Sequence, residues 1–296
     1  MGLTNDKSQL LPSDEDLKFY QEHGWYISQK IISDEEIEEA LKGCQKIHSG
    51  VRDYQLPVQL PIQINWTPEQ NLDSFRCNDF IIQQSIEIRK LALNPLIGRI
   101  ASYLSSSDQI RLFISSLLYK PPGEFDDSVK VGWHNDRAYW KTCTSLNMLT
   151  AWIPLHDCND SMGTIMMIDG SHKWSNNPTL LELRQEKNFS TTKMESLERR
   201  LEATGFSIKK IPMNLKKGQV SFHHCLTFHG SYPNQSHLPR ISVVLHLQDK
   251  SNKYQIAKNK NGKIFVNNLD ELCRKLPDGI PDYSDPLFCP VLWEKK

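Results

Sequence analysis

The change of residue pattern near position 109 most constrains the fold of this 296-residue chain. Before it, the sequence reads as capped helices: Ser13 precedes three acidic residues, and Ser33 precedes Glu36 by three positions, as in a capping box. After it come short runs rich in Val, Ile, Leu, Thr and aromatic residues, separated by turn residues: QIRLFISSLLYK, LNMLTAWIPL, TIMMIDG, QVSFHH and RISVVLHLQ. Helices followed by many strands predict an α+β fold whose β part is a sandwich or a barrel.

We expect one domain over residues 1–296, in three consecutive parts. These are a mainly helical part at 13–105, a β core at 109–250, and a C-terminal extension at 251–296 with a short helix near 268–275. The helical part is expected to hold helices from Ser13 to Gly24 and from Ser33 to Ile47, the strand WYISQKII between them, and a helical stretch over 80–104 that Pro95 breaks.

A polar, charged insert at 172–217 interrupts the strand series and contains a predicted helix at KMESLERRLEAT. A long insert of this kind serves as a lid or substrate loop, or is solvated decoration of the surface. The sequence leaves both interpretations open.

The charge composition and the lack of long apolar runs argue against some classes of binding partner. The 35 basic and 35 acidic residues cancel, without a long run of either sign, so we expect no nucleic-acid or membrane partner. The N-terminus lacks the pattern of a signal peptide, and no stretch approaches the roughly 18 apolar residues of a membrane span. Seven scattered cysteines without a C-x-x-C pair fit reduced thiols in the cytoplasm, where we place the protein. The oligomeric state is left open.

Two histidine segments suggest a metal site. The first, WHNDR, contains His134 and Asp136, whose i, i+2 spacing would place both side chains on one face of a strand. The second, VSFHHCLTFHGS, contains His229, which we expect on a neighbouring strand. Two imidazoles and a carboxylate occupy one face of an octahedral iron(II) and leave the other positions open. Because H-x-D pairs are common by chance, this prediction depends on a second requirement of the same chemistry.

That requirement is a cation for the co-substrate. 2-Oxoglutarate chelates the metal through its keto acid and needs its distal carboxylate held by a fixed positive charge. Arg240, which opens the run RISVVLHLQ, suits this role because its planar fork binds a carboxylate bidentately. The hydroxyl of Ser231 would satisfy a remaining lone pair. The alternative is a surface arginine paired with a nearby acid.

At these residues the chain resembles the phytanoyl-CoA dioxygenase family of iron(II)- and 2-oxoglutarate-dependent oxygenases. The resemblance is carried by four blocks over about 109–248, together with Arg240: YKPPGEFDDSVKVGWHNDRAYW, TAWIPLHD, MGTIMMIDGSHKWS and KKGQVSFHHCLTFHGSYPNQS. One departure is Gln219, which replaces the usual acid after Gly218. The resemblance implies a double-stranded β-helix, a jelly-roll or cupin-like barrel with N-terminal helices packed on it and a lid-like insert.

The same resemblance implies roles for individual residues. His134, Asp136 and His229 would be the iron ligands and the catalytic centre, and Arg240 and Ser231 would hold the distal carboxylate of 2-oxoglutarate. Trp152 would line that pocket and Asn135 would contact the co-substrate. Fe(II), 2-oxoglutarate and O₂ are the implied cofactors. Because related halogenases lack the carboxylate ligand, Asp136 favours hydroxylation, or a related desaturation or cyclisation, over halogenation.

Residues around the predicted centre supply further candidates. Arg137, Tyr139 and Trp140 follow the H-x-D pair directly and would suit a polar or planar small molecule, although Trp140 is equally expected to pack on the barrel exterior. Candidates for orienting the ligands are His223, His224 and Asn147, with His224 expected to be an ordinary packed residue.

We therefore predict a dioxygenase that hydroxylates an unactivated C–H of a small-molecule, secondary-metabolite intermediate and releases succinate and CO₂. An acyl-CoA or other lipid-derived substrate is the alternative, although it would favour a basic patch for its phosphates. Two alternatives belong to other classes of protein. A non-catalytic metal-binding β-barrel would not need Arg240 and Ser231, and a zinc hydrolase would leave Arg240 unexplained and would act without O₂.

Overall fold

The computed structural model describes residues 9–61, 65–70, 74–123, 131–189, 194–259 and 261–296. Parts of the predicted β core (124–130) and of the insert (190–193) lie outside these residues, as does residue 193 at the start of the predicted insert helix. Among the described residues no helix is long and apolar enough to cross a membrane.

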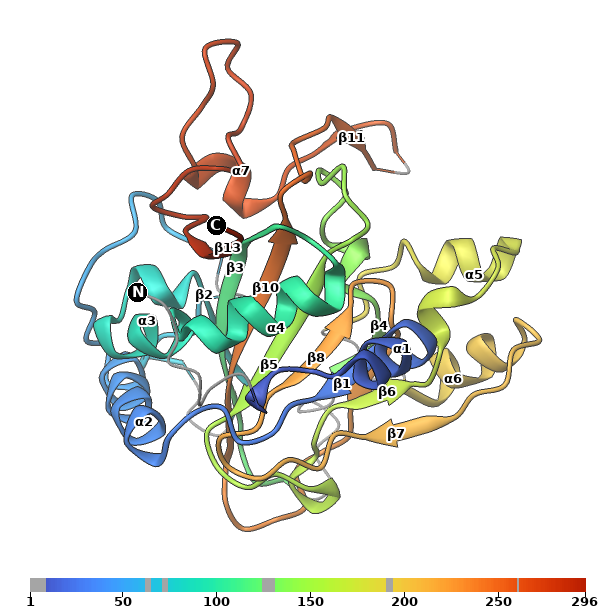
Figure 1. The fold of residues 1–296 in the computed structure, drawn as a ribbon, viewed down its shortest axis with the longest axis horizontal. Helices are drawn as coiled ribbons and strands as arrows, with labels where there is room; N and C mark the ends of the chain where they lie inside the picture. Colours follow the sequence, from blue (N-terminus) through green and yellow to red (C-terminus); the bar gives the residue numbers. More distant parts are fainter. Residues whose placement is uncertain (1–8, 62–64, 71–73, 124–130, 190–193, 260) are drawn as a thin grey trace.

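Two antiparallel sheets make up the β core (Figure 1). The larger sheet has the strand order β1-β8-β5-β10-β3-β13, with β2 also paired to β3. Its strands are β1 (Trp25–Ile27), β2 (Arg76–Asp79), β3 (Gln109–Lys120), β5 (Leu149–Pro154), β8 (Ser221–His224), β10 (Arg240–Asp249) and β13 (Val291–Glu294). The smaller sheet has the order β4-β9-β6-β7, from β4 (Val131–His134), β6 (Met166–Ile168), β7 (Lys210–Pro212) and β9 (His229–Ser231). This is an α+β double-stranded β-helix, and the predicted fold class is confirmed.

Local signals explain the N-terminal helices. Both α1 (Asp14–His23) and α2 (Asp34–His48) begin with the capping boxes that Ser13 and Ser33 form, so these predicted starts are confirmed. Gly24, in the left-handed region with φ 77°, ends α1. The helical stretch expected over 80–104 is two helices, α3 (Ile86–Ala92) and α4 (Pro95–Ser105), because Pro95 starts the second one.

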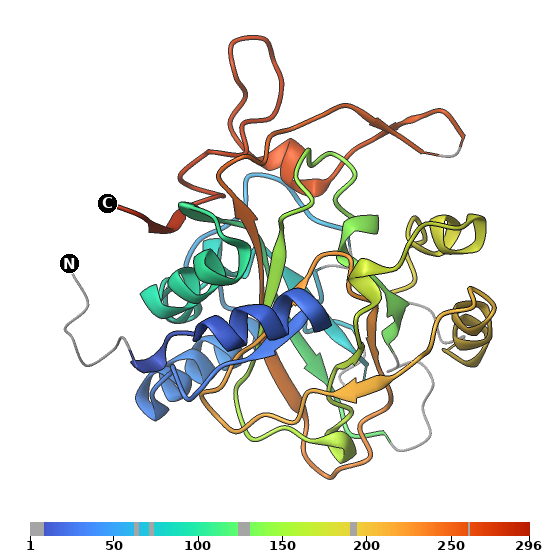
Figure 2. The ribbon, with the colours of Figure 1, turned by 45° about the vertical axis from the view of Figure 1, so that its right-hand side comes forward.

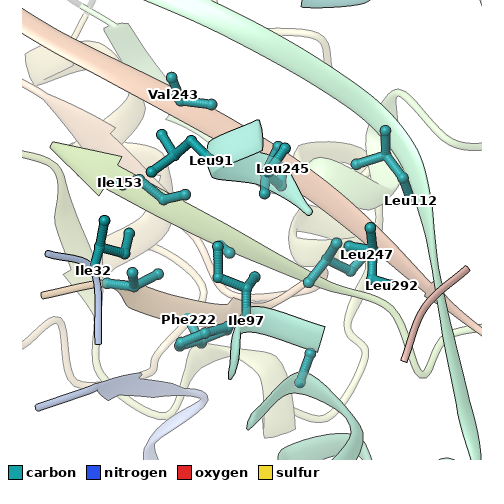
Figure 3. Packing of buried hydrophobic residues seen from close by; sticks show 14 of the residues in the cluster. Ile32, Leu91, Ile97, Leu112, Ile153, Phe222, Val243, Leu245, Leu247 and Leu292 are labelled. Atoms are coloured by element: carbon teal, nitrogen blue, oxygen red, sulfur yellow. The ribbon is translucent and has the colours of Figure 1, made fainter. Parts of the chain in front are cut away.

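Helices α1 to α4 cover the outer face of the larger sheet, and Figure 1 shows α4 in front of β3, β10 and β5. Figure 3 shows Leu91 of α3 beside Ile153 and Leu245, and Ile97 of α4 beside Phe222 of β8. All belong to one buried apolar cluster, which therefore joins the helices to the sheet. At Gly98, α4 approaches β13 so closely that an added Cβ would lie 2.9 Å from the backbone of Leu292.

The inner face of the larger sheet carries alternate residues of each strand, and the pairing register arranges them in rows. One row contains Asp79, Ser116, Val244, Trp152 and Ser221, on β2, β3, β10, β5 and β8. A neighbouring row contains Ile114, His246, Thr150 and His223. At the end of β3 and the beginning of β10, Lys120 is opposite Arg240. Polar groups thus occupy defined places on a face directed toward the smaller sheet.

The insert packs on the smaller sheet. Its helices α5 (Pro178–Leu183) and α6 (Met194–Glu202) lie on the opposite side of the molecule from α2 and α3 in both ribbon views (Figures 1 and 2). Buried side chains of α6, Met194, Leu197 and Leu201, share an apolar cluster with Trp133 and Phe228. The C-terminal extension forms the hairpin β11 (Ala257–Lys258) and β12 (Ile264–Phe265), followed by α7 (Asn268–Leu272).

Candidate active site

The three predicted metal ligands converge where β4 meets β9. His134 is paired with His229 in the antiparallel register, as expected for neighbouring strands. Strand β4 ends at His134, so the prediction that one strand carries both His134 and Asp136 is wrong: Asp136 begins a short 3₁₀ turn. Asn135 between them stays extended (φ −122°, ψ 149°), which keeps the two side chains on one side. One donor atom from each of His134, Asp136 and His229 lies within 4.8 Å of the others.

Backbone carbonyls orient both imidazoles. Nδ1 of His134 lies 2.7 Å from the carbonyl oxygen of Gly132, and Nδ1 of His229 lies 2.9 Å from that of Thr227. Because a carbonyl only accepts, Nδ1 must carry the proton in each ring. The Nε2 lone pairs of both neutral rings are then available for a metal ion, which is the usual arrangement of metal-binding histidines.

Three side chains of the larger sheet hold the carboxylate of Asp136. The Thr150 hydroxyl donates to Oδ2 at 2.6 Å, and His223 Nε2 lies 3.2 Å from the same oxygen. Nδ1 of His246 lies 2.8 Å from the Thr150 hydroxyl and donates to it, since that hydroxyl uses its own proton on Asp136. Oδ1 faces His229, whose Nε2 is 3.6 Å away. The carboxylate is thus supported through one oxygen and free to bind through the other.

The electrostatics favour the protonation states that a metal needs. Burial lowers the pKa of His134 to about 3 and that of His229 to about 4, with a further lowering by the neighbouring imidazole in each case. Burial alone would raise the pKa of the Asp136 carboxyl, but His229 and the hydrogen bond from His223 hold it well below its usual range. At neutral pH the site offers two neutral imidazoles and one carboxylate, the deprotonated ligands that a divalent metal requires.

A buried pair of cations lies beside this cluster. Lys120 Nζ donates to the hydroxyl of Ser231 and to the carbonyl of Tyr232, both at 2.5 Å, and the Arg240 guanidinium donates to the carbonyl of Gly163. Neither cation forms an ion pair with a described residue, and Nε of Arg240 has no hydrogen-bond partner there. Burial, and then the charge of Arg240, hold the pKa of Lys120 well below its usual range. A bound anion would neutralise Arg240 and favour the charged form of Lys120, so this pair makes a site for an anion.

The metal cluster and Arg240 open into one cavity of about 430 Å³. Ser231 and Trp152 line it, and the Trp152 ring centre lies 5.7 Å from the Arg240 guanidinium. Much of the wall is apolar, with side chains from both sheets, the insert and the C-terminal extension: Ile114, Leu118, Trp140, Ile165, Phe189, Val244, Phe265 and Val266. A largely apolar cavity with a few convergent polar groups is the usual form of a small-molecule site.

The remaining predicted site residues divide into two groups. Tyr139 and Trp140 line the cavity, and Trp140 also packs against Phe113 and His246 rather than on the barrel exterior. Asn135 and Arg137 are not among its lining residues.

The side chains of Asn135 and Arg137 have backbone partners instead. The Asn135 amide donates to the Arg184 carbonyl at 3.2 Å. The Arg137 guanidinium donates to the carbonyls of Trp140 and Cys143. The extended backbone at Asn135 points its side chain away from those of His134 and Asp136, and Arg137 lies within the 3₁₀ turn that begins at Asp136.

Among the candidate orienting residues, only His223 reaches the ligands. The ring nitrogen Nδ1 of His224 accepts from the Leu226 backbone, and the Asn147 amide donates to the Ser105 carbonyl. Sequence reasoning missed Lys120, Thr150 and His246. Thr150 and His246 gave a signal, since each is a polar residue flanked by apolar ones within a predicted strand, whereas Lys120 ends its strand and gave none.

A jelly-roll core with a buried two-histidine, one-carboxylate cluster beside a cationic pocket defines the class of iron(II)- and 2-oxoglutarate-dependent oxygenases. The family model for phytanoyl-CoA dioxygenase (PhyH) matches residues 20–242, and the chain belongs to this family. The predicted family, the enzyme class and the cofactors Fe(II), 2-oxoglutarate and O₂ are thereby confirmed.

Curated relatives are distant. The chain is 22% identical over 266 residues to the peroxisomal phytanoyl-CoA dioxygenase of Bos taurus, covering 88% of this chain and 76% of the relative. It is 28% identical over 170 residues to the ectoine dioxygenase of Bordetella bronchiseptica, covering 52% and 53%.

Solved structures share the fold. The non-heme alpha-ketoglutarate-dependent carbocyclase SnoK from nogalamycin biosynthesis superposes with a TM-score of 0.68 at 22% identity, covering 95% of this chain and 96% of that one. EctD from S. alaskensis, solved with 2-oxoglutarate and 5-hydroxyectoine, has a TM-score of 0.62 at 21% identity, covering 86% and 81%.

Proposed function

We propose that this oxygenase hydroxylates an unactivated C–H of a small-molecule intermediate of natural-product biosynthesis, with His134, Asp136 and His229 as the iron ligands. The observation that carries the proposal is the meeting, in one cavity, of this ligand cluster and Arg240, with the buried Lys120 opposite Arg240 and bonded to the cavity-lining Ser231. A metal-binding barrel without 2-oxoglutarate chemistry would gain nothing from two buried basic side chains that have no carboxylate partner among the described residues, because such groups are costly to bury.

The donor set fits iron(II). Two Nε2 atoms and one carboxylate oxygen face one another, and each is held by a partner behind it. When bound, the iron would activate dioxygen for oxidation of the substrate, coupled to conversion of 2-oxoglutarate into succinate and CO₂. The carboxylate ligand supports hydroxylation over halogenation, and desaturation or cyclisation would use the same site.

The spacing along β9 suits 2-oxoglutarate. His229 and Ser231 are two residues apart, so their side chains lie on one side of the strand about 7 Å apart. A five-carbon diacid bound to the metal at its keto acid end would direct its distal carboxylate to Ser231, Lys120 and Arg240. We assign Lys120 and Arg240 to that carboxylate, Ser231 to one of its lone pairs, and the Trp152 ring to the adjacent wall.

The cavity supports a substrate with an apolar body. Tyr139 and Trp140 supply aromatic surface near the metal cluster and remain our candidates for substrate contact. The carbocyclase SnoK and the ectoine dioxygenases act on small molecules, which supports a metabolite of that size. An acyl-CoA substrate is the second candidate, favoured by the likeness to the bovine phytanoyl-CoA dioxygenase. Lys187, the one lysine among the described lining residues, would have to contact its phosphates.

Two further proposals concern the whole chain. One buried apolar cluster contains residues of α1 to α4 and of the larger sheet, which supports a single domain. All seven cysteines are unpaired and buried, which supports a reducing compartment such as the cytoplasm.

The proposal is tested by anaerobic addition of Fe(II) and 2-oxoglutarate to metal-free protein, following the visible absorption band of the chelate. We expect a band in the wild type, none in Asp136→Ala, and one that needs at least tenfold more 2-oxoglutarate in Arg240→Ala. Arg99→Ala, on helix α4 away from the cavity, is the matched control and should behave as wild type. Bound metal without a band in the wild type would overturn the assignment and favour the binding-module or hydrolase alternative.

A further inference from the structure

Asp79 is a charged residue of the cavity that neither iron nor 2-oxoglutarate binding uses. It is the last residue of β2, on the inner face of the larger sheet, and it lines the cavity. Apart from Asp136, it is the only carboxylate among the described lining residues. No described residue forms an ion pair with it.

The hydrogen bonds of Asp79 leave one of its oxygens available. The Ser116 hydroxyl donates to Oδ1 at 2.5 Å, and the Cys77 thiol lies 3.6 Å from the same atom. No described residue donates to Oδ2. Burial raises the pKa of the Asp79 carboxyl to about 6, although the hydrogen bonds from Ser116 and Cys77 partly oppose this shift. A carboxylate kept in such surroundings is costly unless a ligand supplies the missing partner.

The register places Asp79 away from both other functional groups. Ser116, its partner on β3, lies four residues before Lys120 and therefore about 13 Å along the strand from the 2-oxoglutarate anchor. Asp79 is also three strands from Trp152 in its row, about 14 Å across the sheet. The intervening wall is apolar, with Ile114, Leu118 and Val244. A substrate could reach from the metal cluster to Asp79 over this surface.

The charge pattern selects the group that Asp79 would bind. The other charge in the described lining, outside the metal and co-substrate groups, is Lys187, whose Nζ lies over the Phe265 ring at 4.2 Å. Lys187 belongs to the insert, on a different wall from β2. A cationic group of the substrate is attracted by Asp79 and repelled by Lys187. An anionic group is attracted by Lys187 and repelled by Asp79. A protonated amine donates several hydrogen bonds and also neutralises the carboxylate.

We propose that Asp79 binds a protonated amine of the substrate, so that this oxygenase acts on an amine-bearing, otherwise apolar small molecule. The inference rests on the proposed oxidation of a small molecule in the same cavity and adds the chemical class of that molecule. Asp79 is then a substrate-binding residue that fixes which carbon faces the metal.

Three compact probes with the same apolar body test this: 1-adamantylamine, 1-adamantanol and adamantane-1-carboxylate. Binding is measured by anaerobic calorimetry on protein loaded with Fe(II) and saturating 2-oxoglutarate, which keeps the carboxylate probe out of the Lys120–Arg240 site. In the wild type we expect the amine to bind at least tenfold more tightly than the carboxylate and the alcohol. In Asp79→Asn the affinity for the amine should fall at least tenfold and the affinity for the alcohol less than threefold. Asp79→Glu should retain the preference for the amine.

Asp108→Asn, which removes a charge from an exposed aspartate, is the matched control and should change none of the three affinities. Equal binding of the amine and the carboxylate, equal weakening of all three probes in Asp79→Asn, or no binding of the amine would each overturn the proposal. An alcohol that binds as tightly as the amine would show that Asp79 recognises a neutral donor instead. The chelate band is recorded on the same samples: its absence refutes the proposed function, and the amine preference is then decided on the metal-free protein.

Discussion

Lys120 and Arg240 are directly opposite each other on β3 and β10, and both side chains are buried. Like charges repel strongly where water is excluded, so this pairing is unfavourable until an anion lies between them. The Ser231 hydroxyl, which accepts from Lys120, fixes where that anion would lie relative to His229 on the same strand. The larger sheet thus supplies the basic side chains of the anion site, and the smaller sheet supplies the hydroxyl that fixes where the anion would lie.

Replacing Lys120 by Met keeps most of its length and removes its charge. We expect the affinity for 2-oxoglutarate to fall about 10- to 100-fold, since a hydrogen bond to a charged group contributes about 1.5–3 kcal/mol. Titration of the chelate band with 2-oxoglutarate measures this. Because a buried cation is lost, the metal-free variant should be at least as stable as wild type in urea unfolding. An unchanged 2-oxoglutarate requirement would show that Arg240 holds the carboxylate without Lys120.

Thr150→Val removes the hydroxyl that donates to Asp136 and leaves the side-chain shape nearly unchanged. We expect metal affinity to fall about 10- to 100-fold, as is typical when a partner behind a ligand is lost. Competition with a chromophoric chelator measures it. Thr142→Val is the control, because the Thr142 hydroxyl contacts Tyr283 and not the ligands. Equal metal affinity in both variants would contradict a supporting role for Thr150.

Asp79→Asn should change how stability depends on pH. The folded carboxyl has a pKa of about 6, above the ordinary value of 3.8, so the folded wild type binds more protons than the unfolded chain between these values. Wild-type stability from this group is therefore lost as pH rises from 4 to 7. Asp79→Asn lacks this titrating group, so its free energy of unfolding should rise by about 1–3 kcal/mol relative to that of the wild type over the same pH range. Urea unfolding at pH 4, 5, 6 and 7 measures the difference. A constant difference would contradict the raised pKa.

Gly98→Ala reverses the usual effect of this substitution in a helix. Alanine is the better helix former by about 1 kcal/mol, but its Cβ would lie 2.9 Å from the Leu292 backbone on β13. We expect a net destabilisation of about 1–3 kcal/mol from overpacking. Arg99→Ala, the next residue along the same helix, should change stability by less than about 0.5 kcal/mol. A stabilised Gly98→Ala variant would mean that β13 moves away at little cost.

Local signals in the sequence were sufficient for several elements. The capping boxes at Ser13 and Ser33 and the proline at position 95 depend on neighbours within four residues, so the helix boundaries that they predict agree with the structure. Arg240 opens β10 as predicted, and His229 lies on a strand next to His134. Their roles as 2-oxoglutarate and iron-binding residues stay predictions.

Residues that depend on strand register could not be predicted in the same way. Lys120 and Arg240 are 120 positions apart, and only the pairing of β3 with β10 brings them together. The contact of His246 with Thr150 likewise follows from the pairing of β10 with β5. Asn135 and Arg137 were chosen because they adjoin His134 and Asp136, but neither is among the described lining residues of the cavity: Asn135 is extended and alternates with its neighbours, and Arg137 lies in the 3₁₀ turn. Their roles stay predictions.

Different parts of the fold supply different parts of the cavity wall, and this affects how the substrate range of the enzyme can evolve. The proposed iron ligands and the proposed 2-oxoglutarate anchor lie on or directly beside strands of the two core sheets, whereas Lys187, Phe189 and the segment from Phe265 to Asn268 belong to the insert and the C-terminal extension. Segments that lie outside the core sheets accept substitution and changes of length more readily than the core strands do. Selection can therefore alter which molecules enter while the oxidising centre stays constant. Libraries restricted to these six positions would explore new substrates while leaving the core sheets and the proposed iron ligands unchanged.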